Sequence, residues 1–418
     1  MYQKNRHRSI SKITVVVVVI IVIVVATIGG GYYYKSVTAP KPIKTVYVAA
    51  FFPLSGSLSY FGITCLQAAE LAAQNINNYG GLKGANITII SVDTTSSSTQ
   101  AYSIVQNFLS THKNISAAVG LYSSGLTLPV LPLFQKYQIP LIFVAFSNIA
   151  TSLNYTYGFR IAPNATVFGN TMYNFLLTLK SMGFNASRVA IIYDNDAYGA
   201  GVAQAVQADV SSNPFYQVVS VDPYSTSNFT SAGPIVEAVQ AAKPQIILEA
   251  SYLNDSTLIV EGLRQAGLNI PIIGGSGGFP LPQFYSQVGN YSNLIFTAAA
   301  YNAYENKSLA MQVNAQYEQK YGYFMPEAAG AYYQAVIVIA DAINLAHSAN
   351  PVTIDETLHT STFPGGILPE NEIHFNSIGT NVDAEPVIVQ WQNGTLYTVY
   401  PSNLATSKII IPPYPNYT

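Results

Sequence analysis

The chain has 418 residues, of which 49% are hydrophobic, 12% aromatic and only 9% charged. An average soluble domain carries about 25% charged residues, so this surface must be made polar mainly by Ser, Thr, Asn, Gln and Tyr side chains. The formal net charge of −2 argues against a nucleic-acid partner, and the single Cys65 excludes an intrachain disulfide and a cysteine zinc cluster.

The chain opens with an apolar segment that is long enough to span a membrane. Residues 13–34 carry no charge, and a spanning helix needs roughly 20 apolar residues. Four basic residues precede the segment: Lys4, Arg6, Arg8 and Lys12. By the positive-inside rule they keep the N-terminus in the cytoplasm. We therefore expect residues 1–35 to form a cytoplasmic tip and a membrane anchor, with the folded body extracellular. A cleaved signal peptide and a prepilin-like cut are the alternatives.

Eleven Asn-x-Ser/Thr triplets fit an exported body. They begin at Asn86, Asn114, Asn154, Asn164, Asn185, Asn228, Asn254, Asn290, Asn306, Asn393 and Asn416. Such triplets are acceptors of N-linked glycans in exported proteins. Together with the export signal, their number predicts a glycoprotein.

After a Pro-containing linker, 36–44, short apolar runs alternate with longer helical patterns. Strands are expected at 45–51, 86–92, 117–120 and 140–143, and helices at 62–78, 99–109 and 127–137. Cys65 falls within the first of these helices and is expected to be a small buried side chain. Apolar strands without polar alternation indicate a parallel sheet with both faces covered.

The same alternation restarts after a break near residues 159–163. Strands are expected at 189–193, 216–221, 246–249 and 270–274, and helices at 197–210, 232–242 and 255–266. A further helix is expected at 326–345. Strands that alternate with helices predict an α/β fold with mainly parallel sheets.

A body of about 370 residues is too long for one hydrophobic core and suits two domains. We expect two Rossmann-like lobes joined by a hinge that the chain crosses several times. Lobe 1 would comprise residues 45–162 and 300–385, lobe 2 residues 163–299 and 386–411, and the tail residues 412–418. Ligands bind beyond the carboxyl ends of strands in such sheets, so two facing edges would form a cleft.

A series of short motifs runs along the body. They are Pro53-Leu54-Ser55-Gly56, Tyr60-Phe61-Gly62, Gly80-Gly81-Leu82-Lys83-Gly84, Phe159-Arg160, Ile191-Ile192-Tyr193-Asp194 and Gly262-Leu263-Arg264-Gln265-Ala266-Gly267. In order and spacing they resemble the branched-chain amino-acid binding proteins, which are type I periplasmic binding proteins that deliver solutes to ABC transporters. The resemblance runs from residue 45 to about residue 394. It implies an archaeal-like, surface-anchored binding protein that works with a permease and cytoplasmic ATPases.

The resemblance also implies that segments after strands in both lobes close on the ligand. Ser123 and Ser124 follow a strand and begin a helix, whose N–H groups can bind a carboxylate. Either Ser147 or Asn148 would match the loop that completes the carboxylate and ammonium contacts. Aromatic walls would be formed by Phe61, Tyr122, Tyr198 and Tyr252. A plain helix cap for the serines and ordinary packing for the aromatic residues are the alternatives.

One position departs from the resemblance. The family's amino-acid binders carry an acidic residue after a strand of the second lobe, where it pairs with the ligand ammonium. The matching residue here is Ser276, in a run of glycines. A buried ammonium group without a carboxylate loses most of its compensation. Either Glu249 or Asp194 substitutes, or the ligand is an amide, a carboxylate or another small polar solute.

Two other functions fit parts of the sequence. The loop around Ser276 matches the G-x-S-x-G pattern of serine hydrolases, but Pro280 and Pro282 disfavour the helix that this pattern requires. A sensing ectodomain with a separate signalling partner is the second alternative.

Residues 45–51 are not followed by a dinucleotide fingerprint, no phosphate loop is found, and the histidines lack metal-ligand spacing. We expect a binding protein of an ABC importer that is not an enzyme and uses no cofactor.

Overall fold

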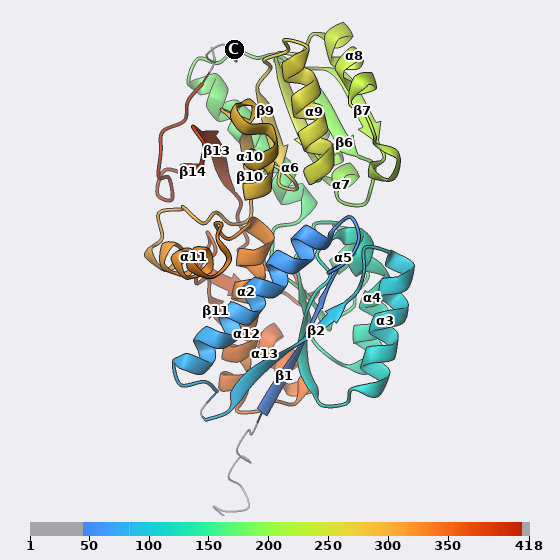
Figure 1. The fold of residues 1–418 in the computed structure, drawn as a ribbon, viewed down its shortest axis with the longest axis vertical. Helices are drawn as coiled ribbons and strands as arrows, with labels where there is room; N and C mark the ends of the chain where they lie inside the picture. Colours follow the sequence, from blue (N-terminus) through green and yellow to red (C-terminus); the bar gives the residue numbers. More distant parts are fainter. Residues whose placement is uncertain (1–44, 83, 412–418) are drawn as a thin grey trace, which may run out of the picture. The chain divides into compact units, whose positions relative to one another are not determined.

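The computed structural model describes residues 45–82 and 84–411. The predicted membrane segment, the linker and the tail lie outside these described residues. The described chain forms two α/β lobes, each built on one mainly parallel sheet between helices (Figure 1). The predicted two-lobed α/β class is therefore observed, while the N-terminal helix of that prediction is not among the described residues.

Lobe 1 is built on a parallel sheet with the strand order β2-β1-β3-β4-β5. Its strands are β1 (Thr45–Phe52), β2 (Asn86–Asp93), β3 (Ile115–Gly120), β4 (Leu141–Phe143) and β5 (Gly158–Arg160). The connecting helices are α2 (Ser59–Asn78), α3 (Ser98–Thr111), α4 (Ser124–Tyr137) and α5 (Ile149–Ser152). Every residue of β3 is buried, as in a parallel strand covered on both faces.

Lobe 2 is built on a seven-stranded sheet with the order β14-β13-β10-β9-β8-β6-β7. Its parallel strands are β6 (Arg188–Asp194), β7 (Gln217–Tyr224), β8 (Ile246–Ala250), β9 (Ile272–Gly275) and β10 (Phe296–Ala299), and β13 (Val387–Gln392) and β14 (Thr395–Tyr400) form an antiparallel edge. The helical elements are α6 (Ala165–Ser181), α7 (Gly199–Ser212), η1 (Thr226–Asn228), α8 (Gly233–Ala242), α9 (Leu253–Gln265), α10 (Pro282–Val288) and η2 (Gly289–Ser292).

Between β10 and β13 the chain returns to lobe 1. This part contains α11 (Ser308–Tyr321), α12 (Glu327–Ala346), α13 (Pro351–Thr360) and the ribbon of β11 (Thr362–Pro364) and β12 (Glu372–His374). Helix α12 packs along α2 and beside β3. The chain thus passes between the two sheets more than once, as predicted; the residue boundaries assigned to the lobes stay a prediction.

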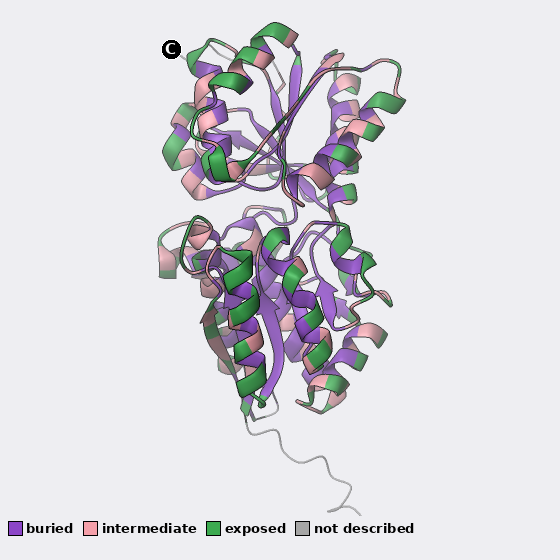
Figure 2. Cartoon of the chain, turned by 90° about the vertical axis from the view of Figure 1, so that its right-hand side faces the viewer, coloured by how far each residue is buried: buried purple, intermediate pink, exposed green. Residues whose placement is uncertain are grey.

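Helix α12 is also the one described helix that is long and apolar enough to cross a membrane. However, 72% of its most apolar 18-residue window is buried inside the folded chain. Tyr332, Val336 and Ile339 are fully buried against the rest of lobe 1. The apolar composition of α12 is therefore explained by its place in the core of lobe 1. Figure 2 shows the same division in the whole fold, with the strands buried and the outer faces of the surface helices exposed.

Three buried carboxyl groups make the stability of this fold depend on pH. Glu249 is the last residue but one of β8, Glu305 follows β10, and Glu370 precedes β12; Glu249 and Glu305 are fully buried and Glu370 nearly so. Burial is the main cause that raises the pKa of each to about 8. In an unfolded chain a Glu has a pKa of about 4.3. Between these values the folded state therefore binds more protons than the unfolded state.

We predict that thermal stability rises as the pH falls from 8 to 5. The stabilising contribution of a raised pKa is complete below the unfolded value and is lost as pH rises through the folded value. Thermal denaturation followed by circular dichroism at several pH values measures it. The triple variant Glu249→Gln, Glu305→Gln, Glu370→Gln should give a flatter profile. A melting temperature that is higher at pH 8 than at pH 5 contradicts the prediction.

Candidate functional site

A cavity of about 30 Å³ lies where strand ends of both lobes meet. Lobe 1 contributes residues that follow β3 and β4, and lobe 2 contributes residues that follow β6, β8, β9 and β10. This is the edge at which open α/β sheets bind ligands. This is about the volume that one water molecule occupies in the liquid, so the lining side chains enclose the space tightly.

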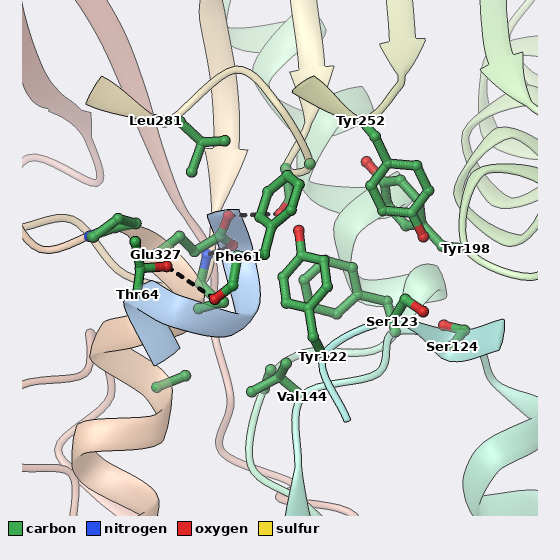
Figure 3. A pocket seen from close by; sticks show the side chains of 18 residues that line it. Phe61, Thr64, Tyr122, Ser123, Ser124, Val144, Tyr198, Tyr252, Leu281 and Glu327 are labelled. Atoms are coloured by element: carbon green, nitrogen blue, oxygen red, sulfur yellow. Dashed lines mark hydrogen bonds between the residues drawn. The ribbon is translucent and has the colours of Figure 1, made fainter. Parts of the chain in front are cut away.

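Aromatic rings from both lobes form the walls of the cavity (Figure 3). The rings of Phe61 and Tyr122 stack with their centroids 4.4 Å apart. Tyr252 of lobe 2 approaches Phe61 to 6.3 Å and Tyr198 to 5.2 Å. Phe146, which the sequence did not single out, approaches Tyr198 to 5.7 Å. All four predicted aromatic residues therefore line one cavity, and their rings connect the two lobes.

The tyrosine walls are electrically neutral. Burial is the largest of the causes that raise the pKa values of Tyr122, Tyr198 and Tyr252 well above 10. The Tyr198 hydroxyl donates to the carbonyl oxygen of Gly275 at 2.8 Å, and the Tyr252 hydroxyl donates to the Asp196 carboxylate at 2.9 Å. These bonds fix the rings, so the walls supply shape and apolar surface rather than charge.

The start of helix α4 provides N–H groups at the cavity. Ser123 is the N-cap residue: its hydroxyl oxygen accepts from Leu126 N–H at 3.3 Å, and its carbonyl oxygen accepts from Thr127 N–H at 3.0 Å. The N–H groups of Ser124 and Gly125 precede these bonds and have no partner within the helix. Ser123 and Ser124 both line the cavity. The helix start can therefore bind an anionic group.

The turn that leads into α4 has a strained backbone. Leu121 and Tyr122 have φ angles of 71° and 64°, in the left-handed region that bulky residues rarely adopt. The Tyr332 hydroxyl of α12 donates to Gly120 O at 2.8 Å and accepts from Tyr122 N–H at 3.2 Å. Such strain persists where surrounding contacts hold it and is frequent at binding sites. Tyr332 thus orients the Tyr122 wall.

The second loop predicted to contact the ligand, at residues 147–148, reaches the cavity through a different residue. Neither Ser147 nor Asn148 lines the cavity, where this loop instead contributes Phe146. Ser147 N–H donates to the Ser124 hydroxyl oxygen at 3.1 Å, so Ser147 contacts the first residue of α4. Asn148 is exposed and donates to Thr166 at 2.8 Å beside a separate depression. A direct ligand contact of Ser147 or Asn148 stays a prediction.

The floor of the cavity contains a carboxylic acid, Glu327, that was not predicted from the sequence. Ser276, predicted to lie here, lines the cavity, and its hydroxyl donates to Glu327 at 2.6 Å. The other carboxylate oxygen of Glu327 accepts from Ala300 N–H at 2.5 Å. Burial raises the pKa of Glu327 to about 7. Glu327 is the first residue of α12, so in the sequence Pro326-Glu327 carries only the signal of a helix start.

The two acids considered from the sequence lie elsewhere. Glu249 accepts from the Ser251 hydroxyl at 2.8 Å, and Asp194 accepts from Thr226 N–H at 3.0 Å. Neither of them lines the cavity. Among the described residues, no group of three or more His, Cys, Asp or Glu side chains is placed to hold a metal ion.

The loop at Ser276 does not form the nucleophile elbow of a hydrolase. That motif requires a strand, a sharp turn and then a helix. Here β9 ends at Gly275, and the next helix begins only at Pro282. The Ser276 hydroxyl pairs with a carboxylate, and the described residues that line the cavity include no histidine. The arrangement lacks the histidine that acts as the general base in hydrolases of this kind.

Comparison with known proteins identifies the family. The family described as "Periplasmic binding protein" matches residues 45–395. The chain belongs to this family. Among curated relatives of this periplasmic binding protein, Leu/Ile/Val-binding protein homolog 8 of Brucella abortus is 27% identical over 380 residues, which cover 87% of this chain and 92% of the relative. Homolog 7 of Brucella suis is 25% identical, and the match covers 88% of this chain and 94% of the relative.

Solved structures share the fold of this periplasmic binding protein. The branched-chain amino acid transporter substrate-binding protein LivJ of Streptococcus pneumoniae, in complex with isoleucine, has a TM-score of 0.74 at 24% identity, covering 84% of this chain and 98% of that one. The leucine-binding protein LivK of Thermotoga maritima has a TM-score of 0.72 at 19% identity, covering 84% and 97%. The predicted resemblance is confirmed, and so is the prediction that the chain is not an enzyme.

We predict that Tyr332→Phe destabilises the protein by about 1–3 kcal/mol, because it leaves a buried carbonyl without a donor. Loss of the bond to Tyr122 N–H should also loosen the strained turn and weaken ligand binding. Tyr333→Phe is the matched control on the same helix, since it removes only a bond from Asn75, at 3.0 Å, away from the cavity. Thermal denaturation and calorimetric titration measure both effects. Equal ligand affinity in the two variants contradicts the role assigned to Tyr332.

Proposed function

We propose that this chain is the solute-binding protein of an ABC importer. It captures a small polar ligand, an amino acid, an amide or a related carboxylate, in the cavity between its lobes. The observation that carries this proposal is the cavity itself, which joins strand ends of both lobes and includes the start of α4. The names of the Brucella relatives and the titles of the LivJ and LivK structures point to the same class of ligand.

The start of α4 is the proposed carboxylate subsite. A helix N-terminus carries partial positive charge, and its first N–H groups are available to an anion. Ser124 is only 1% exposed, so water competes little with a ligand there. The Ser124 hydroxyl already accepts from Ser147 N–H and keeps its own hydrogen for the ligand. A carboxylate would therefore meet two backbone donors and one hydroxyl donor.

The rest of the cavity suits an apolar side chain. Phe61, Val144, Phe146 and Leu281 line it together with the tyrosine rings. Burial of an apolar side chain of the ligand stabilises the complex by about 25 cal/mol per Å² of surface removed from water. Leucine, isoleucine and valine are therefore the first ligands to examine.

Ligand capture works by closure of the lobes. Tyr252 and Tyr198 of lobe 2 meet Phe61 and Phe146 of lobe 1 around the cavity, so a ligand there touches both lobes. A ligand stabilises the closed form by the difference between its affinities for the closed and open forms. The permease would then recognise the closed form, as hinge closure around a ligand changes the outer surface.

We further propose that the protein is held at the cell membrane by its N-terminal segment and works there with permease subunits and their ATPases. The sequon asparagines support an extracellular, glycosylated body in an archaeal-like setting. Nine of them are exposed: Asn86, Asn114, Asn154, Asn185, Asn228, Asn254, Asn290, Asn306 and Asn393. Intact-mass measurement on protein purified from its own membranes should show added glycan. A mass equal to that of the bare polypeptide contradicts glycosylation.

We predict that Ser124→Pro weakens ligand affinity by about 10-fold or more, because it removes a backbone donor to a charged group. Proline is tolerated at the first position of a helix, and Ser123 has the extended backbone that precedes proline readily. Ser124→Ala is the matched control, since it loses the hydroxyl but keeps the N–H group. Calorimetric titration with L-leucine, L-isoleucine and L-valine compares the two variants. If Ser124→Pro binds as tightly as Ser124→Ala, the carboxylate does not bind at α4.

A further inference from the structure

The charges around the cavity are unbalanced. Among the described residues that line it, Glu327 is the one carboxyl group, and none is Lys, Arg or His. A carboxylate removed from water is costly unless a positive charge or several donors compensate it. No described lining side chain can supply a positive charge to the Glu327 carboxylate, so a ligand cation is the partner that remains for it.

We propose that Glu327 pairs with the ammonium group of the ligand, so that the cavity selects α-amino acids over amides and simple carboxylates. This inference rests on the proposed function and names its substrate class. Glu327 takes over the role for which an acid was expected at Ser276. The acid is supplied by the first residue of α12 instead of the loop after β9.

The position of the Glu327 carboxylate is fixed by two donors. Ser276 hydroxyl and Ala300 N–H each bind one of its oxygens. An ionised carboxylate offers about four lone-pair directions, so about two are left for a ligand. The backbone of Ser276 is itself held in the left-handed region, with a φ of 67°. Such a conformation has to be maintained by its surroundings, as expected where a side chain must be aimed.

The two charged subsites are separated within the cavity. In the view of Figure 3, Glu327 lies on one side of Tyr122 and the serines of the α4 start lie on the other. A ligand with a carboxylate and an ammonium group can therefore address both ends while its side chain faces the aromatic walls. A simple carboxylate would use only the α4 start and leave Glu327 without a cation.

The other carboxylic acids near the site are less suited to the role. Asp196 accepts from the Tyr252 hydroxyl and from the N–H groups of Tyr198 and Gly199, and it does not line the cavity. Glu249 is fully buried behind the lining residues. Burial raises the pKa of Glu327 to about 7, so a nearby ammonium group readily shifts it to the ionised form.

The test compares L-leucine with 4-methylpentanoate, which has the same carbon skeleton and carboxylate but no ammonium group. Glu327→Gln keeps the shape of the side chain and an acceptor for Ala300 N–H, and removes the charge. We expect Glu327→Gln to lose leucine affinity by on the order of 100-fold, as for a buried charge pair that loses one partner. Its affinity for 4-methylpentanoate should stay the same or increase. Glu327→Asp, which keeps the charge, should bind leucine with intermediate affinity.

Glu249→Gln is the matched control, and it should bind leucine as the wild type does. Binding of 4-methylpentanoate to Glu327→Gln also shows that the variant is folded. Unchanged leucine affinity in Glu327→Gln, or an equal loss for both ligands, overturns the inference while the proposed function stands. If the wild type binds neither compound nor any aliphatic amino acid, the proposed function fails first, and this inference fails with it.

Discussion

The direction of the strands determines where a ligand can bind in this protein. Strands β1 to β5 run parallel in lobe 1, and β6 to β10 run parallel in lobe 2. Every crossover helix therefore begins at the same edge of its sheet, and the loops before these helices gather there. Residues as distant in sequence as Tyr122 and Tyr252 come to line one cavity for this reason. The chemistry of the site then depends on which side chains these loops carry.

Helix α12 connects this arrangement to the core. Its apolar surface packs along α2 in lobe 1, while its first residue, Glu327, lies in the cavity next to Ser276 of lobe 2. One turn further along, the Tyr332 hydroxyl bonds the turn that carries Tyr122. The same helix thus holds an aromatic wall and the one acid among the described lining residues. Changes in α12 should consequently alter both stability and ligand selection.

Much of this fold could be predicted from local patterns. The continuous apolar runs at 189–193 and 246–249 lie within β6 and β8, and Ser123 and Ser124 were placed at the start of a helix. The antiparallel edge formed by β13 and β14 was not predicted, although Asn393-Gly394 at its turn is a strong hairpin signal. Helix α6 was not predicted, although Asn164 before it is a typical N-cap residue whose side chain accepts from Val167 N–H.

The candidate site depends more than the fold does on tertiary contacts, which local sequence patterns do not encode. Seven predicted residues line the cavity, because each follows a strand and the strand ends converge. Glu327 was not predicted, because its position depends on a distant helix returning to lobe 1, and local periodicity does not encode that packing. The loop that carries Ser147 reaches the cavity through Phe146, whereas Ser147 N–H bonds the Ser124 hydroxyl and does not line the cavity. Side-chain direction within a loop depends on tertiary contacts of this kind.

We propose above all that one cavity binds both charged groups of an amino acid, the carboxylate at the start of α4 and the ammonium group at Glu327. A crystal structure of the protein with L-leucine tests it most directly. We expect leucine between the two lobes, with its carboxylate at the N–H groups of Ser124 and Gly125. Its ammonium nitrogen should lie about 3 Å from a Glu327 oxygen. Leucine bound elsewhere, or bound with its ammonium group directed away from Glu327, would contradict the account.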